Sequence, residues 1–181
     1  MNRDVMEAGI RQFLEGLFDG LDEPAAKEWI EQTPGRVARA FEEDLAAGYG
    51  EDPSSFLEPI PVEDASGAVI LEGIRFTSLC AHHLLPFRGE VTVGFVPDRS
   101  HVGLGGIARL VDSLSRRLCL QESLTAEIAD HLQRALHPKA VVVVVEAEHL
   151  CLAARGARKI GHRFRTIERR GTSHPELDHL R

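Results

Sequence analysis

Five consecutive valines, at residues 141–145, predict a buried β-strand in the second half of this chain. β-Branched side chains lose rotamer freedom in a helix and pack well on a pleated surface, so such a run favours a strand. The apolar run, residues 140–145, is far too short to cross a membrane. We therefore expect a strand over residues 140–147 and a sheet around it that another layer must cover.

The segments before residue 67 follow a helical pattern instead. Apolar spacing predicts a helix over residues 5–21, and Pro24 marks the start of a short second one. Thr33-Pro34 has the form of a helix start, with Thr as N-cap and Pro at the first helical position, so we expect a third helix that ends at Gly48. The polar residues 50–66 are typical of a linker.

Beyond the linker the periodicity changes repeatedly. It predicts two strands, two helices and two strands, over residues 68–77, 90–96, 103–118, 124–136, 140–147 and 163–168. This order predicts an α+β fold with the helices on one sheet face. We divide the chain into an N-terminal helical arm and linker (1–66), a domain (67–170) and a polar tail (171–181) that we expect to be poorly ordered.

Charge and cysteine usage exclude several classes of protein. The 181 residues carry a formal net charge of −7, which argues against general affinity for nucleic acid or an anionic membrane. The N-terminus alternates charged and apolar residues, so we expect no signal peptide. The three cysteines do not fit a disulfide framework, so we expect a reducing cytoplasm as the location.

Two short clusters carry the chemistry. Cys80 and His83 stand three positions apart in one loop, and Cys151 follows His149 by two positions at the end of a strand. Two thiols and an imidazole can hold a zinc ion and leave its fourth position open, as hydrolytic zinc sites require. His82 and His149 would then stand beside the metal. The alternative is a pair of buried free cysteines with solvated loop histidines.

Other residues are candidates for binding an anionic nucleotide. Four arginines are candidate anion contacts, although most single surface arginines are merely solvated: Arg36, Arg39, Arg109 and Arg155. Gln121-Glu122 pairs a carboxamide with a carboxylate, which suits the N1–H and 2-amino group of guanine. An ordinary helix-capping pair is the alternative for these two residues.

The chain resembles the GTP cyclohydrolase I family. The resemblance rests on several motifs in the family's order and spacing: TPGRVARAFEE, SLCAHHLLPFRGEV, VGLGGIARLVD, RRLCLQESLT and VEAEHLCLAARG. It implies a four-stranded antiparallel sheet with two helices on one face (a tunnelling-type fold), and subunits joined edge to edge into a homo-oligomer, a decamer in this family. It also implies zinc-dependent opening of the guanine imidazole ring of GTP, with release of formate, to give 7,8-dihydroneopterin triphosphate for pterin and tetrahydrofolate biosynthesis.

The resemblance implies a role for each candidate residue. Cys80, His83 and Cys151 would bind zinc, and His82 and His149 would handle protons, with His149 protonating N7. Gln121 and Glu122 would hold guanine. The four arginines would face the triphosphate: Arg36, Arg39, Arg109 and Arg155.

Three departures from the family pattern keep other functions open. Ala81 replaces the Glu of Cys-Glu-His-His, Gly105-Gly106 replaces the Ser-Lys of Gly-Leu-Ser-Lys, and the usual Thr-Ser-rich ending is largely lost. One alternative is a divergent paralogue that opens a related purine nucleotide or stops at a ring-opened intermediate. The other is a catalytically silent scaffold or regulatory subunit, against which the intact His82 and His149 argue.

Overall fold

The computed structural model describes residues 1–63 and 67–180, so residues 64–66 of the predicted linker and Arg181 of the predicted tail lie outside the described residues. The chain forms two compact units, Met1–Ala47 and Gly48–Arg181. No helix among the described residues is both long and apolar enough to span a membrane.

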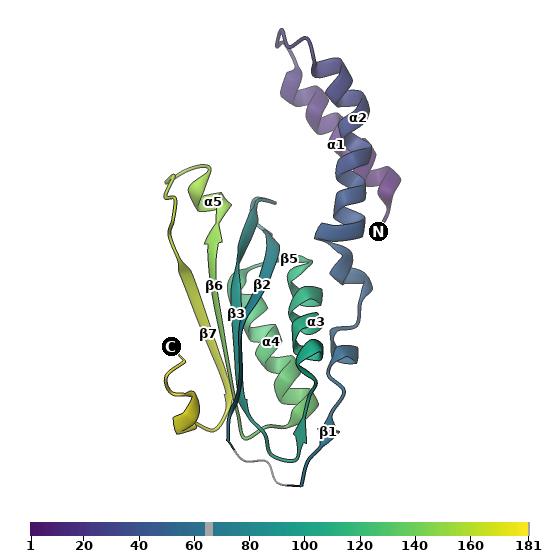
Figure 1. Cartoon of the computed structure of the whole chain (residues 1–181). Helices are drawn as coiled ribbons and strands as arrows, with labels where there is room; N and C mark the ends of the chain where they lie inside the picture. Colours follow the sequence, from purple (N-terminus) through teal and green to yellow (C-terminus); the bar gives the residue numbers. More distant parts are fainter. Residues whose placement is uncertain (64–66, 181) are drawn as a thin grey trace. The chain divides into compact units, whose positions relative to one another are not determined.

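The first unit is a helical hairpin followed by a π-helical turn. Its elements are α1 (Arg3–Phe18), α2 (Ala26–Ala40) and η1 (Phe41–Leu45) (Figure 1). The prediction that a new helix starts at Pro34 is wrong, because α2 runs straight through this residue. Pro34 has no N–H for the carbonyl of Ile30, and the guanidinium of Arg11 donates to that oxygen instead, at 2.9 Å. A contact from another helix thus removes part of the cost of proline inside a helix.

The second unit is built on a five-stranded sheet in the order β5-β2-β3-β6-β7. Its strands are β2 (Val69–Cys80), β3 (Pro86–Val96), β5 (Leu118–Cys119), β6 (Ala140–His149) and β7 (Phe164–Gly171). The α+β class is confirmed, and the four long strands pair antiparallel as expected. The expectation of four strands misses one, because the two-residue β5 adds a fifth strand, parallel to the end of β2.

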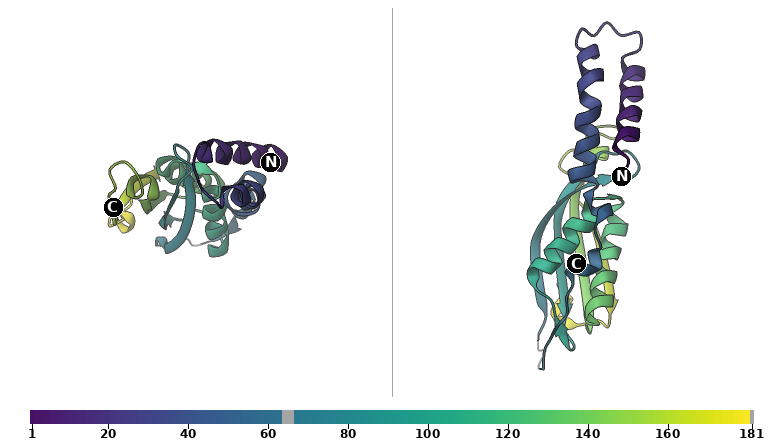
Figure 2. Two further views of the ribbon diagram at one scale, coloured as in Figure 1. Left: turned by 90° about the horizontal axis from the view of Figure 1, so that it is seen from above. Right: turned by 90° about the vertical axis from the view of Figure 1, so that its right-hand side faces the viewer.

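Two helices cover one face of this sheet, α3 (Leu104–Ser115) and α4 (Gln121–Leu136) (Figures 1 and 2). Alternate valines of β6 enter the core under these helices, as the period of a strand requires: Val141, Val143 and Val145. Helix α4 begins three residues earlier than expected, so Gln121 and Glu122 form its first turn.

The opposite face of β6 is covered by the end of the chain. Val142 packs there with Leu177 and Leu180, which are 0% and 7% exposed. Leu177 belongs to the short 3-10 turn η4 (Pro175–Leu177). The expectation of a poorly ordered tail is therefore wrong for the described residues, because two leucines hold it on the sheet.

The segment before β2 has short regular pieces of its own. They are η2 (Ala47–Gly50), η3 (Pro53–Phe56) and β1 (Ile60–Pro61), which pairs with β4 (Ser100–His101). Asp52 caps η3 by accepting a hydrogen bond from the backbone N–H of Ser54, at 3.0 Å. The described part of the predicted linker thus lies along the domain that follows it.

Strands β3 and β6 approach each other closely at Gly89, which is paired with Ala147. A Cβ atom at Gly89 would lie 1.9 Å from the carbonyl oxygen of Glu146 and 2.7 Å from the Cα of Ala147. Only glycine fits there without moving a strand. Two positions away, the same pairing sets Phe87 opposite His149.

Candidate metal centre and its surroundings

A tight turn at the end of β2 presents the first two candidate ligands. The carbonyl of Cys80 accepts hydrogen bonds from the backbone N–H groups of His83 (3.2 Å) and Leu84 (2.8 Å), and the Cys80 N–H donates to the carbonyl of Leu85 at 2.9 Å. Leu84 adopts a left-handed conformation with φ 56°. The turn reverses the chain into β3 and leaves His83 beside Cys80.

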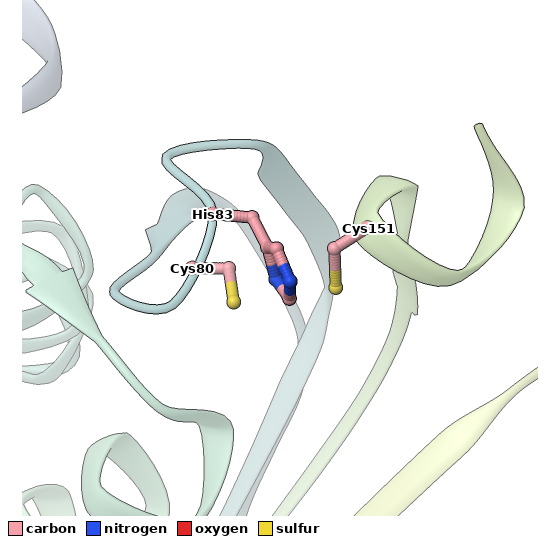
Figure 3. A group of neighbouring side chains, drawn as sticks. All are labelled: Cys80, His83 and Cys151. Atoms are coloured by element: carbon pink, nitrogen blue, oxygen red, sulfur yellow. The ribbon is translucent and has the colours of Figure 1, made fainter. Parts of the chain in front are cut away.

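The third candidate ligand comes from the far side of β3. Strand β6 ends at His149, and the short helix α5 (Leu150–Ala153) follows with Cys151 in its first turn. The ligand atoms of Cys80, His83 and Cys151 all lie within 4.8 Å of one another (Figure 3). All three cysteines of the chain are free thiols. The structure therefore brings the two predicted clusters together into one candidate metal site.

The protonation of this site depends on its own neighbours. Burial raises the pKa of the Cys151 thiol, and the adjacent Cys80 raises it further. A bound cation acts in the opposite direction, because thiols bind metals as thiolates. The guanidinium of Arg155 lies 2.7 Å from Nε2 of His83. Since a guanidinium can only donate, this nitrogen accepts.

His149 is held between two aromatic rings beside the candidate site. Its imidazole stacks on Phe87 with ring centroids 4.5 Å apart and planes 5° apart, and it meets Phe164 edge to face at 5.6 Å. Its Nδ1 lies 4.0 Å from the sulfur of Cys151. Burial lowers the pKa of His149, and the nearby His162 lowers it further. The imidazole is thus oriented and favours the neutral form.

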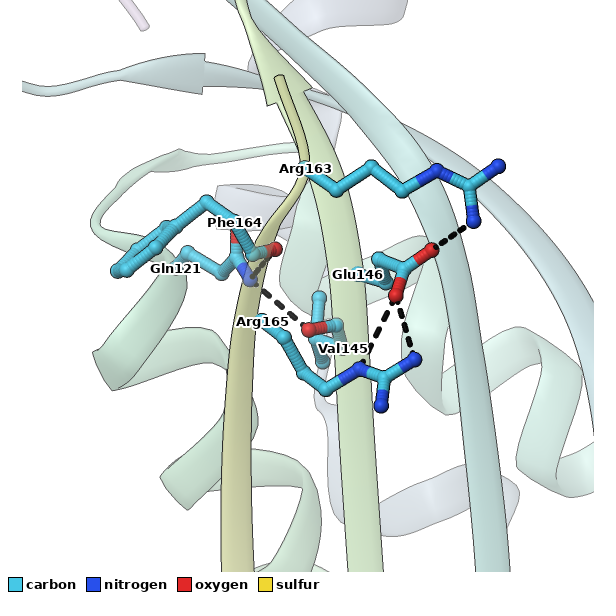
Figure 4. A network of polar contacts seen from close by, with 6 residues as sticks. All are labelled: Gln121, Val145, Glu146, Arg163, Phe164 and Arg165. Atoms are coloured by element: carbon cyan, nitrogen blue, oxygen red, sulfur yellow. Dashed lines mark hydrogen bonds and ion pairs between the residues drawn. The ribbon is translucent and has the colours of Figure 1, made fainter. Parts of the chain in front are cut away.

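The other ring nitrogen of His149 faces Gln121. Its Nε2 lies 2.9 Å from Oε1 of Gln121, whose side chain is fully buried. The amide nitrogen of Gln121 donates to the carbonyls of Val145 (2.9 Å) and Phe164 (3.0 Å), as Figure 4 shows. Both polar ends of Gln121 therefore face protein groups, whereas Glu122 beside it is exposed.

A cavity of about 460 Å³ opens beside this cluster, a size typical of small-molecule sites. Its lining contains most of the candidate residues: Cys80, His82, Gln121, Glu122, His149 and Cys151. A larger hollow of about 580 Å³ lies over the sheet face that α3 and α4 do not cover. Its Glu146 already forms ion pairs with Arg163 (2.8 Å) and Arg165 (2.6 Å) (Figure 4). The smaller cavity is the better candidate for chemistry.

The predicted arginines do not gather within the described part of this unit. Arg155 reaches His83, while Arg109 is exposed on α3 and is not among the residues that line the cavity. Arg36 and Arg39 are exposed on α2, in the other unit. Their predicted contact with a triphosphate stays a prediction.

Sequence reasoning missed two residues that hold His149. Phe87 stacks on its ring, and Nε2 of His162 accepts a hydrogen bond from its backbone N–H at 3.1 Å. His162 is itself fixed through Nδ1, 2.7 Å from the carbonyl of Lys159. No sequence spacing marks these contacts, because they depend on strand register and on the loop before β7.

The two glycines that replace Ser-Lys differ in their surroundings. A Cβ on Gly105 would meet nothing within 4 Å, but one on Gly106 would lie 2.3 Å from the carbonyl oxygen of Phe56. A lysine would therefore not fit at Gly106 unless the backbone of η3 moved. The glycine at position 106 is therefore required by the close packing of α3 against η3.

Comparison with known proteins agrees with this geometry. A family model described as GTP cyclohydrolase I matches residues 7–179. The chain is 44% identical over 163 residues to GTP cyclohydrolase 1 of Desulforamulus reducens, covering 90% of this chain and 87% of the relative. It is 46% identical over 158 residues to that of Brucella anthropi, covering 86% and 71%.

A solved structure supports the fold alone. The archaeosine synthase QueF-Like, in its apo form, superposes with a TM-score of 0.51 at 22% identity, covering 61% of this chain and 99% of that one. The family match extends over nearly the whole chain, and the sequence identity to the relatives is 44% and 46%. The chain belongs to the GTP cyclohydrolase I family.

Proposed function

We propose that this protein opens the guanine imidazole ring of GTP by hydrolysis, releases formate and forms 7,8-dihydroneopterin triphosphate. One observation carries the proposal: two thiols and an imidazole converge within 4.8 Å beside an oriented second imidazole. The family of the chain supports the same reaction.

The donor set fits zinc. We assign Cys80, His83 and Cys151 as the ligands, since two sulfurs and one nitrogen match catalytic zinc sites that keep a fourth position open. Zinc bound there would supply a Lewis acid that makes water a nucleophile near neutral pH. Arg155 now donates to Nε2 of His83. If His83 used this nitrogen as its ligand atom, the guanidinium would be free to bind an anion.

Two histidines are assigned to proton transfer. Nδ1 of His149 lies next to Cys151, so once it has taken up a proton it is placed to give that proton to N7 of a purine bound at the centre. His82 is exposed and lines the same cavity, where it can exchange protons with water. The aromatic contacts of His149 hold its ring in one plane, which general acid catalysis requires.

Substrate recognition is assigned to exposed polar groups. Glu122 lines the cavity and can accept hydrogen bonds from N1–H and the 2-amino group of guanine. The triphosphate is assigned to arginines that a single unit of this chain does not bring together: Arg36, Arg39, Arg109 and Arg155. Gln121 has a buried side chain and is assigned a different role.

The open strand edges support a homo-oligomer, and we propose the decamer that the resemblance implies. Among the described residues, β7 has a partner strand on one edge only, and β2 is covered by β5 only at Leu79 and Cys80. Different edges that pair with each other close into rings. We also propose that residues 67–170 carry the catalysis, that residues 1–66 form its arm and linker, and that the free thiols work in a reducing cytoplasm.

The test is turnover of GTP by the zinc-loaded protein, followed by formate release and by pterin fluorescence after oxidation. Formate together with a pterin supports the proposal, and His149→Ala should abolish both products while zinc stays bound. Formate without a pterin would show that ring opening occurs and ring closure does not. Neither product from an intact zinc-loaded assembly would refute the proposal and favour another purine nucleotide or a silent subunit.

A further inference from the structure

We propose that Gln121 is a positioning residue, which holds His149 in the tautomer that carries its proton on Nε2. The inference rests on the proposed role of His149 in proton transfer. It replaces the direct contact between Gln121 and guanine that the sequence suggests.

The orientation of the Gln121 amide is fixed by its surroundings. Its nitrogen lies 2.9 Å from the carbonyl oxygen of Val145 and 3.0 Å from that of Phe164. Main-chain carbonyls can only accept, so the group that faces them must be the NH₂ and not the oxygen. A flipped amide would set three oxygens against one another in a fully buried place.

Two threonines fix the same orientation from another direction. The Gln121 nitrogen lies 3.1 Å from Oγ1 of Thr166, and this hydroxyl lies 2.6 Å from Oγ1 of Thr125. Thr125 donates its own proton to the backbone carbonyl of Gln121, at 2.7 Å. Thr125 must therefore accept from Thr166. The hydroxyl of Thr166 can then only accept from the Gln121 NH₂, whose two hydrogens are shared among three acceptors: this hydroxyl and the carbonyls of Val145 and Phe164. The hydrogen bonds form a closed ring that begins and ends on Gln121.

The tautomer of His149 follows from this ring. Because the amide nitrogen is committed to other groups, Oε1 of Gln121 faces Nε2 of His149 at 2.9 Å and can only accept. Nε2 must then carry a hydrogen whether the imidazole is neutral or charged. Nδ1, which lies 4.0 Å from the sulfur of Cys151, is then the ring nitrogen without a hydrogen in the neutral imidazole.

Burial excludes the competing role of Gln121. Its side chain is 0% exposed, and both ends of the amide already have partners. A contact with guanine through this side chain would require a movement that opens the buried amide to the cavity. Glu122, the next residue, is exposed and lines the cavity.

The experiment reads the tautomer directly by solid-state ¹⁵N NMR of zinc-loaded, [¹⁵N]histidine-labelled full-length protein at pH 8. Protonated and unprotonated imidazole nitrogens give well-separated signals, and His149→Gln identifies those of His149. We expect hydrogen on Nε2 in the wild type, and a second population with hydrogen on Nδ1 in Gln121→Met. Gln121→Glu should keep the wild-type tautomer, because a protonated carboxyl group can donate to one of the two carbonyls and accept from Nε2 through its other oxygen. Glu122→Gln is the matched control and should leave the tautomer unchanged.

Kinetics separate positioning from binding. Gln121→Met should lower kcat for GTP by about 10- to 100-fold with little change in KM. Glu122→Gln should mainly raise KM. A wild-type proton on Nδ1, an unchanged spectrum in Gln121→Met, or a rise in KM alone would each overturn the proposal. If Gln121→Met does not fold, the wild-type spectrum still decides, and a wild type without activity would refute only the proposed reaction.

Discussion

Replacing Thr125 by valine should destabilise the second unit by more than the loss of an exposed hydroxyl does. Thr125 is 0% exposed, and its hydroxyl connects Thr166 to the carbonyl of Gln121 at 2.6 and 2.7 Å. Valine has the same shape, so no cavity opens, but the hydroxyl of Thr166 loses its acceptor. Thr166 is half-buried, and the carbonyl of Gln121 also loses the hydroxyl that donates to it. Polar groups that lose a partner inside a protein cost about 1–3 kcal/mol.

A loss near the middle of that range, about 2 kcal/mol, would raise the unfolded-to-folded ratio roughly 30-fold. It would also lower the urea midpoint by roughly 0.7–1 M if the urea dependence of the free energy is about 2–3 kcal/mol per M. Urea unfolding at one fixed protein concentration measures this shift. The fixed concentration matters because subunit association would add to the apparent stability.

Thr172→Val is the matched control for this measurement. Its hydroxyl also donates to a backbone carbonyl, that of Lys139 at 3.0 Å, but the residue is exposed and water can replace the bond. We expect a change below about 0.5 kcal/mol for the control. Equal effects of Thr125→Val and Thr172→Val would refute the closed hydrogen-bond ring.

Three further predictions concern packing, pH and metal. Gly106→Ala should lower the melting temperature, because its Cβ atom would clash with η3 at a cost of about 1–3 kcal/mol. Gly105→Ala has open space around it and should not lower the melting temperature. If calorimetry shows that both variants are tolerated, the described packing of Gly106 is contradicted. Burial lowers the pKa of His131, so the unfolded chain binds a proton more readily, and stability present above about pH 6.5 is lost as the pH falls through the folded pKa. His131→Gln should therefore flatten the stability profile below about pH 6.5. An unchanged acid slope in urea unfolding would exclude this cause. Removal of zinc by a chelator should lower the melting temperature. In elemental analysis Cys151→Ser should contain no zinc, whereas Cys119→Ser should retain it. Equal losses of zinc in the two variants would contradict the assigned ligands.

The main chemistry of the site could be predicted from the sequence because its residues are adjacent in short motifs. Cys80 and His83 share one turn, and His149 and Cys151 share one strand end. Their meeting needs only that β2 and β6 lie on either side of β3, which the order of elements favours. The valines of β6 were predicted for a similar local reason, since β-branched runs fit few other structures.

Other features depend on contacts between distant residues. Helix α2 continues through Pro34 because Arg11, far away in the sequence, donates to the carbonyl of Ile30. Gln121 faces His149 because α4 begins earlier than its apolar pattern suggests, which turns the first residue of the helix inward. Neither partner can be identified from local propensity. The sequence therefore predicted that Gln121 matters, and only the structure indicates what it touches.

The glycine at position 89 also restricts how β3 and β6 can pair while the chain folds. A slip of one residue would place Arg88 or Glu90 opposite Ala147, where a Cβ atom would come within 1.9 Å of a backbone oxygen. Slipped pairings are a common source of misfolded sheets, and each slip also turns every side chain to the wrong face. Gly89 therefore penalises the nearest incorrect registers without adding any contact to the correct one. The same register sets Phe87 against His149. A chain that pairs β3 and β6 in this register therefore also stacks the His149 imidazole on Phe87.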